Sequence, residues 1–226
     1  MLGIITALDT ERDAVLSQME AVKESQTAGM RFFEGTLYGR KAVVAESGVG
    51  KVMAAAGTAI MLTRWPVREL LNIGIAGGLV EGMQPLDLVL SQSLVQADFD
   101  SSAVDGPEGL GIAAPADPQM VERARKAAER LHIPTYTGLI ASQDLFLARP
   151  DDIARLLERF PETRAAEMEG AAVASVAQAF GVPCLVVRAI SDVVQHPQSH
   201  LDFWKFRELA AAQAGRFLQA YLQEGD

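Results

Sequence analysis

Residues 165–192 read AAEMEGAAVASVAQAFGVPCLVVRAISD, and this stretch decides the fold class. A short strand over Ala165–Glu167 leads into a helix of small residues over Gly170–Phe180, which Gly181 is well suited to end. The continuous apolar run over Cys184–Ile190 then predicts a buried strand. A strand, a helix and a second strand in such close succession are typical of α/β proteins with a mainly parallel sheet.

The same alternation extends over the rest of the chain. Further strands are predicted over Leu2–Leu8, Arg31–Leu37, Lys41–Ala45, Leu70–Ile75, Leu86–Val95 and Thr135–Ala141. Helices are predicted over Asp9–Met19 (with Asp9 or Thr10 near its N-cap), Lys51–Arg64, Val121–Leu131, Asp151–Phe160 and Leu201–Tyr221. The early hairpin around Tyr38–Arg40 makes the sheet mixed, and the Asp-, Gly-, Ser- and Pro-rich segment Asp98–Pro118 is expected to be a loop.

The composition fits one globular domain over residues 1–226, with 49% apolar and 22% charged residues and no internal repeat or linker. A net charge of −9, from 29 acidic and 20 basic residues, argues against nucleic acid or an anionic membrane as partner. The opening Met1–Ile5 has no basic region before it, and no run approaches the roughly 18 apolar residues of a membrane helix. With Cys184 as the only cysteine, we expect a cytoplasmic protein.

Several catalytic and metal-binding motifs can be tested and rejected. The segment Ser47–Lys51 resembles a phosphate-binding loop, but Ala45 and Val52 stand where that motif needs glycine and a hydroxyl. His196 and His200 are four residues apart, but Pro197 between them makes a helical metal site improbable, so no metal is expected. Neither a serine nucleophile motif nor a reactive cysteine is found.

Acidic residues follow three of the predicted strands. Glu11 lies just after the first strand, Glu167 and Glu169 end a short one, and Asp192 follows Cys184–Ile190. Ligands of α/β sheets collect beyond the carboxyl ends of strands, so these acids are candidate site residues. Arg188 lies inside the last apolar run and needs a carboxylate partner, which Glu11 or Glu169 could supply. A structural ion pair with helix-capping acids explains the same pattern, and spacing alone does not separate the two interpretations.

Two motifs, Glu167-Met168-Glu169 and Arg188-Ala189-Ile190-Ser191-Asp192, resemble the signature pair of the nucleoside phosphorylase superfamily. The stretches Gly3–Glu11, Ser47–Val52, Gly138–Ser142 and Ser199–Leu201 are most similar to its 5′-methylthioadenosine/S-adenosylhomocysteine nucleosidase branch. The resemblance runs in register along nearly the whole chain. It implies a single-domain, three-layer αβα fold with a twisted mixed central sheet.

The resemblance implies hydrolysis of the N-glycosidic bond of 5′-methylthioadenosine and S-adenosylhomocysteine, releasing adenine and the 5′-thio-substituted ribose. Asp192 would be the general acid at adenine N7, and Glu11 the general base that deprotonates water. Phosphorylases surround an anion at the corresponding place, whereas a carboxylate at Glu11 repels phosphate. Hydrolysis is therefore favoured over phosphorolysis.

The resemblance also implies how the substrate is bound. Glu169 would hold the ribose hydroxyls, Arg188 would orient the water and the acids, and Phe146 would stack on the purine. The remaining implied substrate contacts are Met168, Leu147, Ser191, Val49, Ala76, Gly77 and Phe203. No metal or organic cofactor is implied. The implied partners are a small nucleoside and a second copy of the chain, with neither nucleic acid nor membrane.

Two departures from the family pattern keep alternatives open. Ile75 stands where relatives usually carry a small hydroxyl residue, and the segment over residues 96–114 is shorter than in close relatives. In the family this segment helps to close the pocket for the 5′ substituent, partly across a dimer interface. A futalosine or aminofutalosine hydrolase, a purine nucleoside phosphorylase, and a nucleoside-binding or storage protein on the same fold are the alternatives. Asp192 favours adenine, because a carboxylic acid can meet both N7 and the exocyclic amine.

Overall fold

The computed structural model describes residues 1–193 and 199–224, with the side chains of all these residues except 199–202. The strands are β1 (Leu2–Thr6), β2 (Met19–Thr27), β3 (Met30–Leu37), β4 (Arg40–Glu46), β5 (Glu69–Gly78), β6 (Leu88–Asp100), β7 (Leu110–Pro115), β8 (Thr135–Ser142), β9 (Thr163–Glu167) and β10 (Cys184–Val193). The helices are α1 (Asp9–Leu16), α2 (Lys51–Arg64), α3 (Ser102–Asp105), the 3₁₀ turn η1 (Gly106–Gly109), α4 (Pro118–Arg130), α5 (Pro150–Arg159), α6 (Gly170–Ala179) and α7 (Ser199–Gln223).

The described strands form one mixed ten-stranded sheet with the order β10-β6-β8-β9-β5-β1-β4-β3-β2, and β7 pairs with β6. Strand β10 pairs with β5 in parallel and with β6 in antiparallel orientation. Strands β5, β10, β6, β8 and β9 therefore close into a ring, while β1, β4, β3 and β2 extend from β5 as an open sheet. The prediction of a mixed sheet is confirmed, but its partial closure had no signal in the sequence.

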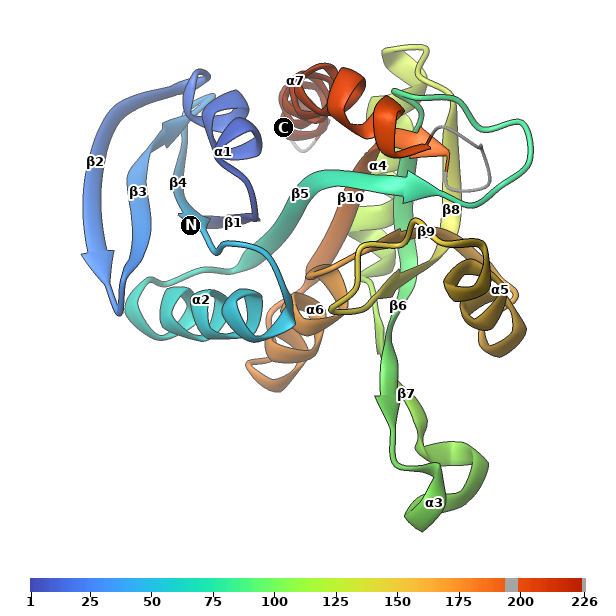
Figure 1. Ribbon diagram of the computed structural model, residues 1–226. Helices are drawn as coiled ribbons and strands as arrows, with labels where there is room; N and C mark the ends of the chain where they lie inside the picture. The colour runs from blue at the N-terminus through green and yellow to red at the C-terminus, as the bar shows by residue number, and fades with distance from the viewer. Residues whose placement is uncertain (194–198, 225–226) are drawn as a thin grey trace.

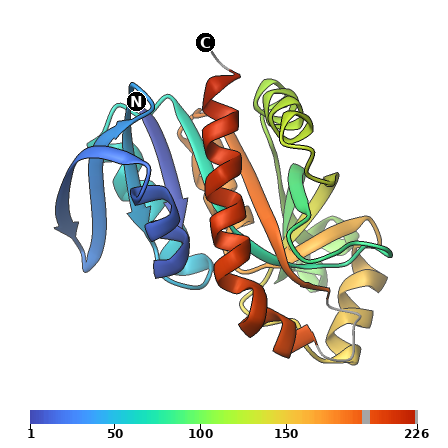
Figure 2. The same cartoon turned by 90° about the horizontal axis from the view of Figure 1, so that it is seen from above.

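Helices cover both faces of the sheet (Figures 1 and 2). Helices α1, α4 and α7 lie on one face, where Val15, Ala124 and Phe217 belong to one buried apolar cluster. Helices α2 and α6 lie on the other face, where Met61 and Val173 belong to a second cluster. The three-layer arrangement expected from the resemblance is thus present, and burial of the two apolar clusters stabilises it.

The region after β1 differs from the prediction. Helix α1 ends at Leu16 rather than Met19, and Met19–Thr27 forms strand β2 at the edge of the sheet. Most side chains of β2 are exposed, so the strand has no alternating apolar pattern by which it could be recognised. Its formation depends on antiparallel hydrogen bonds to β3.

The segment predicted as a loop over Asp98–Pro118 is instead an ordered arm. Strand β6 continues to Asp100, and Leu110–Pro115 returns as β7 in antiparallel pairing with β6. Helix α3 and turn η1 form the tip, which stands away from the body of the molecule (Figure 1). The Gly- and Pro-rich composition correctly marked the turn at the tip but not the paired strands beside it.

The closing strand–helix–strand unit has the predicted boundaries to within a few residues. Helix α6 ends at Ala179 with Phe180 as its C-cap, and Gly181 follows with φ +66°, the left-handed conformation that suits glycine after a helix. The carboxyl ends of β1, β5, β8, β9 and β10 meet at one edge of the sheet, where the acidic residues gather. Among the described helices, none is both long and apolar enough to cross a membrane.

Candidate active site

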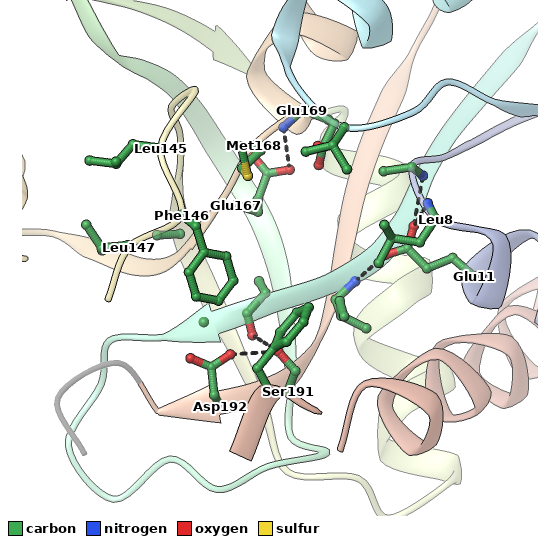
Figure 3. Close-up of a pocket in the computed structure, with 17 residues that line it drawn as sticks. Leu8, Glu11, Leu145, Phe146, Leu147, Glu167, Met168, Glu169, Ser191 and Asp192 are labelled. Atoms are coloured by element: carbon green, nitrogen blue, oxygen red, sulfur yellow. Dashed lines mark hydrogen bonds between the residues drawn. The ribbon is translucent and has the colours of Figure 1, made fainter. Parts of the chain in front are cut away.

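A pocket lies at the carboxyl ends of strands β1, β5, β8, β9 and β10 (Figure 3). Every residue predicted for the site except Arg188 lines it, namely Glu11, Val49, Ala76, Gly77, Phe146, Leu147, Met168, Glu169, Ser191, Asp192 and Phe203. The lining residues beyond those predicted are Ala7, Leu8, Ile75, Leu145, Ala166 and Glu167. Residues far apart in sequence thus share one cavity, because β1 and β10 run parallel to β5 and the carboxyl end of β9 meets that of β5 in antiparallel pairing.

Backbone N–H groups from two chain segments hold the carboxylate of Glu11. Its Oε2 accepts hydrogen bonds from the N–H groups of Ala7 (2.8 Å) and Leu8 (2.9 Å), and its Oε1 accepts one from Ile75 (3.0 Å). Leu8 is the N-cap of α1, so Glu11 reaches back to cap its own helix. The predicted cap at Asp9 or Thr10 is therefore wrong: Asp9 instead accepts a hydrogen bond from the Thr10 N–H (2.7 Å).

Glu11 is only 5% exposed, and this burial is the main influence on its protonation. Desolvation raises the pKa of this carboxyl above its usual value, and the charge of Arg188 and the three backbone donors only partly oppose the rise. The fit is close: a Cβ added at Gly74 would lie 2.6 Å from Oε1 of Glu11. Glycine at position 74 is required for this carboxylate to approach β5.

A β-bulge sets the direction of Ser191 and Asp192. The register between β10 and β5 shifts between Ile190 and Asp192. Such a bulge re-aims side chains at the end of a strand, and both residues line the pocket. The hydroxyl Oγ of Ser191 lies 2.7 Å from Asp192 Oδ1 and 3.3 Å from the carbonyl oxygen of Ala76.

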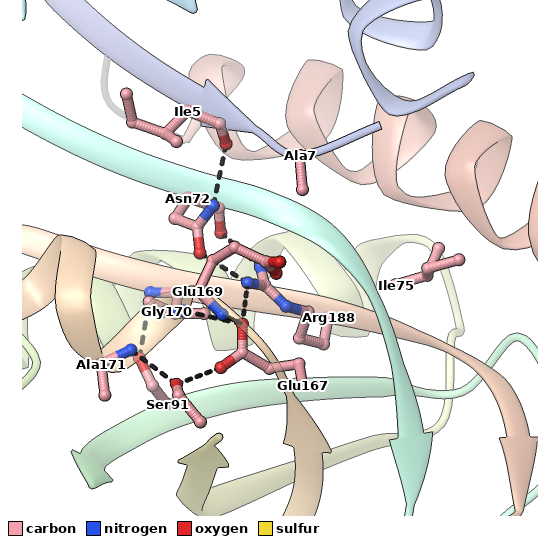
Figure 4. A network of polar contacts seen from close by, with 12 residues as sticks. Ile5, Ala7, Asn72, Ile75, Ser91, Glu167, Glu169, Gly170, Ala171 and Arg188 are labelled. Atoms are coloured by element: carbon pink, nitrogen blue, oxygen red, sulfur yellow. Dashed lines mark hydrogen bonds and ion pairs between the residues drawn. The ribbon is translucent and has the colours of Figure 1, made fainter. Parts of the chain in front are cut away.

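The partner of Arg188 differs from the prediction. Arg188 pairs with Glu167, and not with Glu11 or Glu169 (Figure 4). Its Nη2 also donates to Asn72 Oδ1 (2.5 Å), and its Nη1 donates to the Asn72 carbonyl oxygen (3.2 Å). Strands β9 and β10 lie on either side of β5, so Glu167 at the end of β9 faces Arg188 across Asn72 of β5. This lateral order could not be read from sequence spacing.

Glu167 is a candidate site residue to which the sequence interpretation gave no role of its own. Its carboxylate accepts hydrogen bonds from the Ser142 hydroxyl and from the backbone N–H groups of Glu169 (3.1 Å) and Gly170 (2.7 Å). It thus caps helix α6 while it pairs with Arg188. The signal was present: a buried arginine required a carboxylate, and the Glu-Met-Glu motif offered two.

Glu169, the N-cap residue of α6, also lines the pocket. Its Oε1 accepts a hydrogen bond from the Gly50 N–H (2.9 Å) at the start of α2. Desolvation, with the nearby charge of Glu167, raises the pKa of the Glu169 carboxyl to about 8. Near neutral pH this carboxyl therefore takes up a proton more readily than an ordinary glutamate, and in its protonated form it can donate as well as accept hydrogen bonds.

Aromatic side chains also line the pocket. The rings of Phe146 and Phe203 meet edge to face with centroids 5.2 Å apart, and Trp204 continues the row at 5.5 Å. Phe146 is 46% exposed, so one of its faces is open to a ligand. The pocket is therefore lined by both aromatic rings and carboxyl groups, and Figure 3 shows Asp192 close to Phe146 with Glu11 and Glu169 at other parts of the cavity.

The described residues contain no cluster of three or more His, Cys, Asp or Glu side chains placed to hold a metal ion. His196 and the side chain of His200, considered as ligands from their spacing, lie outside the described residues.

Comparison with known proteins first defines the class. The family model described as Phosphorylase superfamily matches residues 1–223. Curated 5′-methylthioadenosine/S-adenosylhomocysteine nucleosidases from Glaesserella parasuis and Geobacillus kaustophilus are each 37% identical over 225 residues. These alignments cover 98% and 97% of this chain, and 97% and 95% of theirs. The chain belongs to the 5′-methylthioadenosine/S-adenosylhomocysteine nucleosidase family.

Solved structures agree with this assignment. The Neisseria meningitidis nucleosidase in complex with methylthio-immucillin-A superposes with a TM-score of 0.93 at 30% identity, and the alignment covers 98% of each chain. The futalosine hydrolase of Helicobacter pylori superposes with a TM-score of 0.92 at 33% identity, over 99% of this chain and 97% of that one. Both structures therefore share the fold described above.

The Arg188–Glu167 pair yields a first prediction. Arg188→Met leaves the Glu167 carboxylate buried without its cation, which should lower the free energy of unfolding by about 3–5 kcal/mol. The double variant Arg188→Met/Glu167→Gln removes both charges and should be more stable than the single variant. Urea unfolding at fixed protein concentration measures four proteins: wild type, Arg188→Met, Glu167→Gln and the double variant. Strictly additive losses would show that the two side chains do not interact.

A second prediction concerns Glu169 and pH. Its pKa is raised from the usual 4.5 to about 8 in the folded state, so the folded state binds the proton more tightly. The stabilisation that comes from this tighter proton binding is complete below the pKa of the unfolded state, and it is lost as pH rises through the pKa of the folded state. The free energy of unfolding should therefore fall between pH 5 and pH 8, and fall less in Glu169→Gln. Glu158→Gln, which removes an exposed carboxylate from α5, controls for net charge; equal slopes in wild type and Glu169→Gln would contradict the prediction.

Proposed function

We propose that this chain hydrolyses the N-glycosidic bond of 5′-methylthioadenosine and S-adenosylhomocysteine, releasing adenine and the 5′-thio-substituted ribose. The observation that carries the proposal is the pair of buried carboxyls, Glu11 and Asp192, in one pocket with aromatic side chains and a third acid, Glu169. N-glycoside cleavage develops positive charge on the ribose while the purine leaves. An acid-lined pocket stabilises that charge.

Glu11 acts as the general base that deprotonates the attacking water. Burial raises its pKa and so brings its basicity closer to neutral pH, where a general base is most effective. The three backbone donors hold the carboxylate in place before substrate arrives. Arg188 does not line the pocket, and its support for the site is its ion pair with Glu167 and its charge near Glu11.

Asp192 acts as the general acid that protonates adenine N7. The bulge in β10 directs its side chain into the pocket, and Ser191 supports one carboxyl oxygen. Phe146 and Phe203 offer the aromatic surface against which the purine stacks. Glu169 binds the ribose hydroxyls, where a carboxyl that both donates and accepts hydrogen bonds suits a diol.

Water is the proposed nucleophile rather than phosphate. A phosphate dianion beside Glu11 would be repelled by the carboxylate. It would also lack hydrogen-bond donors, because the backbone N–H groups of Ala7, Leu8 and Ile75 already donate to Glu11. Futalosine is a second candidate substrate, because the H. pylori futalosine hydrolase shares the fold at 33% identity. Ile75 lines the pocket near Glu11, at the position where relatives of the family usually carry a small hydroxyl residue.

The active form is proposed to be a homodimer of one-domain chains in the cytoplasm, working without metal or organic cofactor. The support for dimerisation is apolar surface: Val104 on the arm is 87% exposed and Val52 on α2 is 75% exposed. Lys51 and Asp98 are ion-paired, so the start of α2 lies beside the base of the arm. A free, buried Cys184 suits a reducing compartment.

A third prediction tests the reaction. Purified protein should release adenine from 5′-methylthioadenosine and S-adenosylhomocysteine without phosphate, as measured by chromatography of the free base over a panel that includes futalosine, adenosine and inosine. Asp192→Asn and Glu11→Gln should each lower kcat by roughly 10²–10⁴. Asp151→Asn, an exposed change on α5, is the control. Strict dependence on phosphate would sink the hydrolase assignment, and unchanged turnover in Asp192→Asn would refute its role as acid.

A fourth prediction tests the assembly. Light scattering should give twice the chain mass of 24.2 kDa, and Val104→Asp or Val52→Asp should shift the protein toward monomer because a charge on an apolar interface costs its desolvation. The monomeric form should bind substrate more weakly. Full activity in a monomer at all concentrations would rule out a pocket shared across the interface.

A further inference from the structure

A charged cluster just outside the pocket joins three segments of the chain. Lys51, the first residue of α2, has its Nζ 2.5 and 2.6 Å from the two carboxylate oxygens of Asp98 near the end of β6. The same Nζ lies 3.3 Å from Oδ2 of Asp144, in the segment after β8. The Lys51 side chain is only 15% exposed. We call Lys51, Asp98 and Asp144 the Lys51 cluster.

Backbone hydrogen bonds tie the same three segments together. The Lys51 N–H donates to Asp144 Oδ1 (2.8 Å), and the Asp144 N–H donates to Asp98 Oδ2 (2.9 Å). Gly50, the N-cap of α2, offers no side chain to cap the helix, so Asp144 does so from another segment. A Cβ on Gly50 would lie 3.2 Å from Asp144 Oδ1, and the φ of Gly50 is +100°, so glycine allows this approach.

Each segment of the cluster continues directly into a wall of the pocket. Gly50 donates its N–H to Glu169, and Val49 before it lines the pocket. Leu145 and Phe146, which also line it, follow Asp144. The cluster itself does not line the pocket, so it can act on a ligand only through these neighbours.

We propose that Lys51 is a positioning residue for substrate binding, because it locks the segment that carries Phe146 against the start of α2 that supports Glu169. The identity of the substrate rests on the proposed function. Glu11 on α1 and Asp192 on β10 belong to elements that the cluster does not bond, so loosening the cluster should weaken binding of the purine nucleoside and leave bond cleavage nearly unchanged. The cluster thus sets KM rather than kcat.

Within the Lys51 cluster, Lys51 and Asp98 interact strongly enough to change the pKa of Asp98. Partial burial alone would raise the pKa of Asp98, but hydrogen bonds from Lys51 and from the Asp144 N–H lower it below its usual value. An ordinary surface ion pair is worth only about 0–1 kcal/mol and would leave ligand affinity untouched. Affinity for substrate therefore separates a positioning role from a merely structural one.

The test compares Lys51→Met, Lys51→Arg and wild type in steady-state hydrolysis of 5′-methylthioadenosine. Lys51→Met should raise KM about tenfold or more with kcat within about threefold of wild type, and Lys51→Arg should recover most of the loss. Lys126→Met on α4, where Lys126 lies 3.7 Å from the exposed Glu122, is the matched control and should behave as wild type. A fall in kcat with unchanged KM would overturn the proposal.

Calorimetric titration with adenine gives a readout that does not need turnover. The dissociation constant should rise in Lys51→Met, and in Asp98→Asn, which keeps a hydrogen-bond acceptor and serves if Lys51→Met does not fold. A lower Tm with unchanged KM and unchanged adenine affinity would show a structural role only and refute positioning. Wild-type protein that binds adenine but cleaves no nucleoside would refute the proposed function alone, whereas wild-type protein that does neither would refute both.

Discussion

The buried ion pair between Arg188 and Glu167 is the interaction on which the site depends. It joins β10 to β9 across Asn72 of β5, whose side chain in turn donates to the Ile5 carbonyl oxygen of β1 (3.0 Å). Four strands that end at the pocket are therefore linked by one polar network beneath it. Such a pair is costly to bury unless its hydrogen bonds are satisfied, so the network constrains all four strand ends at once.

The same network places more negative than positive charge under the pocket. Arg188 is the single cation facing Glu167, Glu169 and Glu11 within the described part of the chain, and all three raise its pKa. Glu167 takes the direct contact, and desolvation by burial raises the pKa values of Glu169 and Glu11. The position of one arginine thus divides three glutamates into a structural carboxylate and two chemically adjustable ones.

Secondary structure supplies the remaining precision. Glu11 is both the cap of α1 and a ligand of the β5 backbone, so it cannot shift without disturbing a helix and a strand. Asp192 depends on a bulge in β10, and Glu169 on the N–H of Gly50 at the start of α2. Groups built on the ends of regular elements are held more firmly than groups on free loops, which suits a reaction that needs several acids in fixed positions.

Local patterns were sufficient for much of this protein. The alternation of apolar runs and amphipathic segments predicted most of the strands and helices, and the acids at strand ends predicted Glu11, Glu169 and Asp192 as residues of one pocket. These predictions succeeded because burial periodicity and strand-end position are properties of short stretches. The resemblance of two motifs then supplied the chemistry.

What the sequence by itself determined was the set of elements and the acids that follow them. Only the tertiary structure decided that Glu167 pairs with Arg188, that β10 closes a ring with β5 and β6, and that residues 98–118 form a paired arm. The physical reason is common to all three. Lateral strand order and long-range hydrogen bonding depend on contacts between residues distant in the chain, and no local periodicity encodes which strand lies beside which.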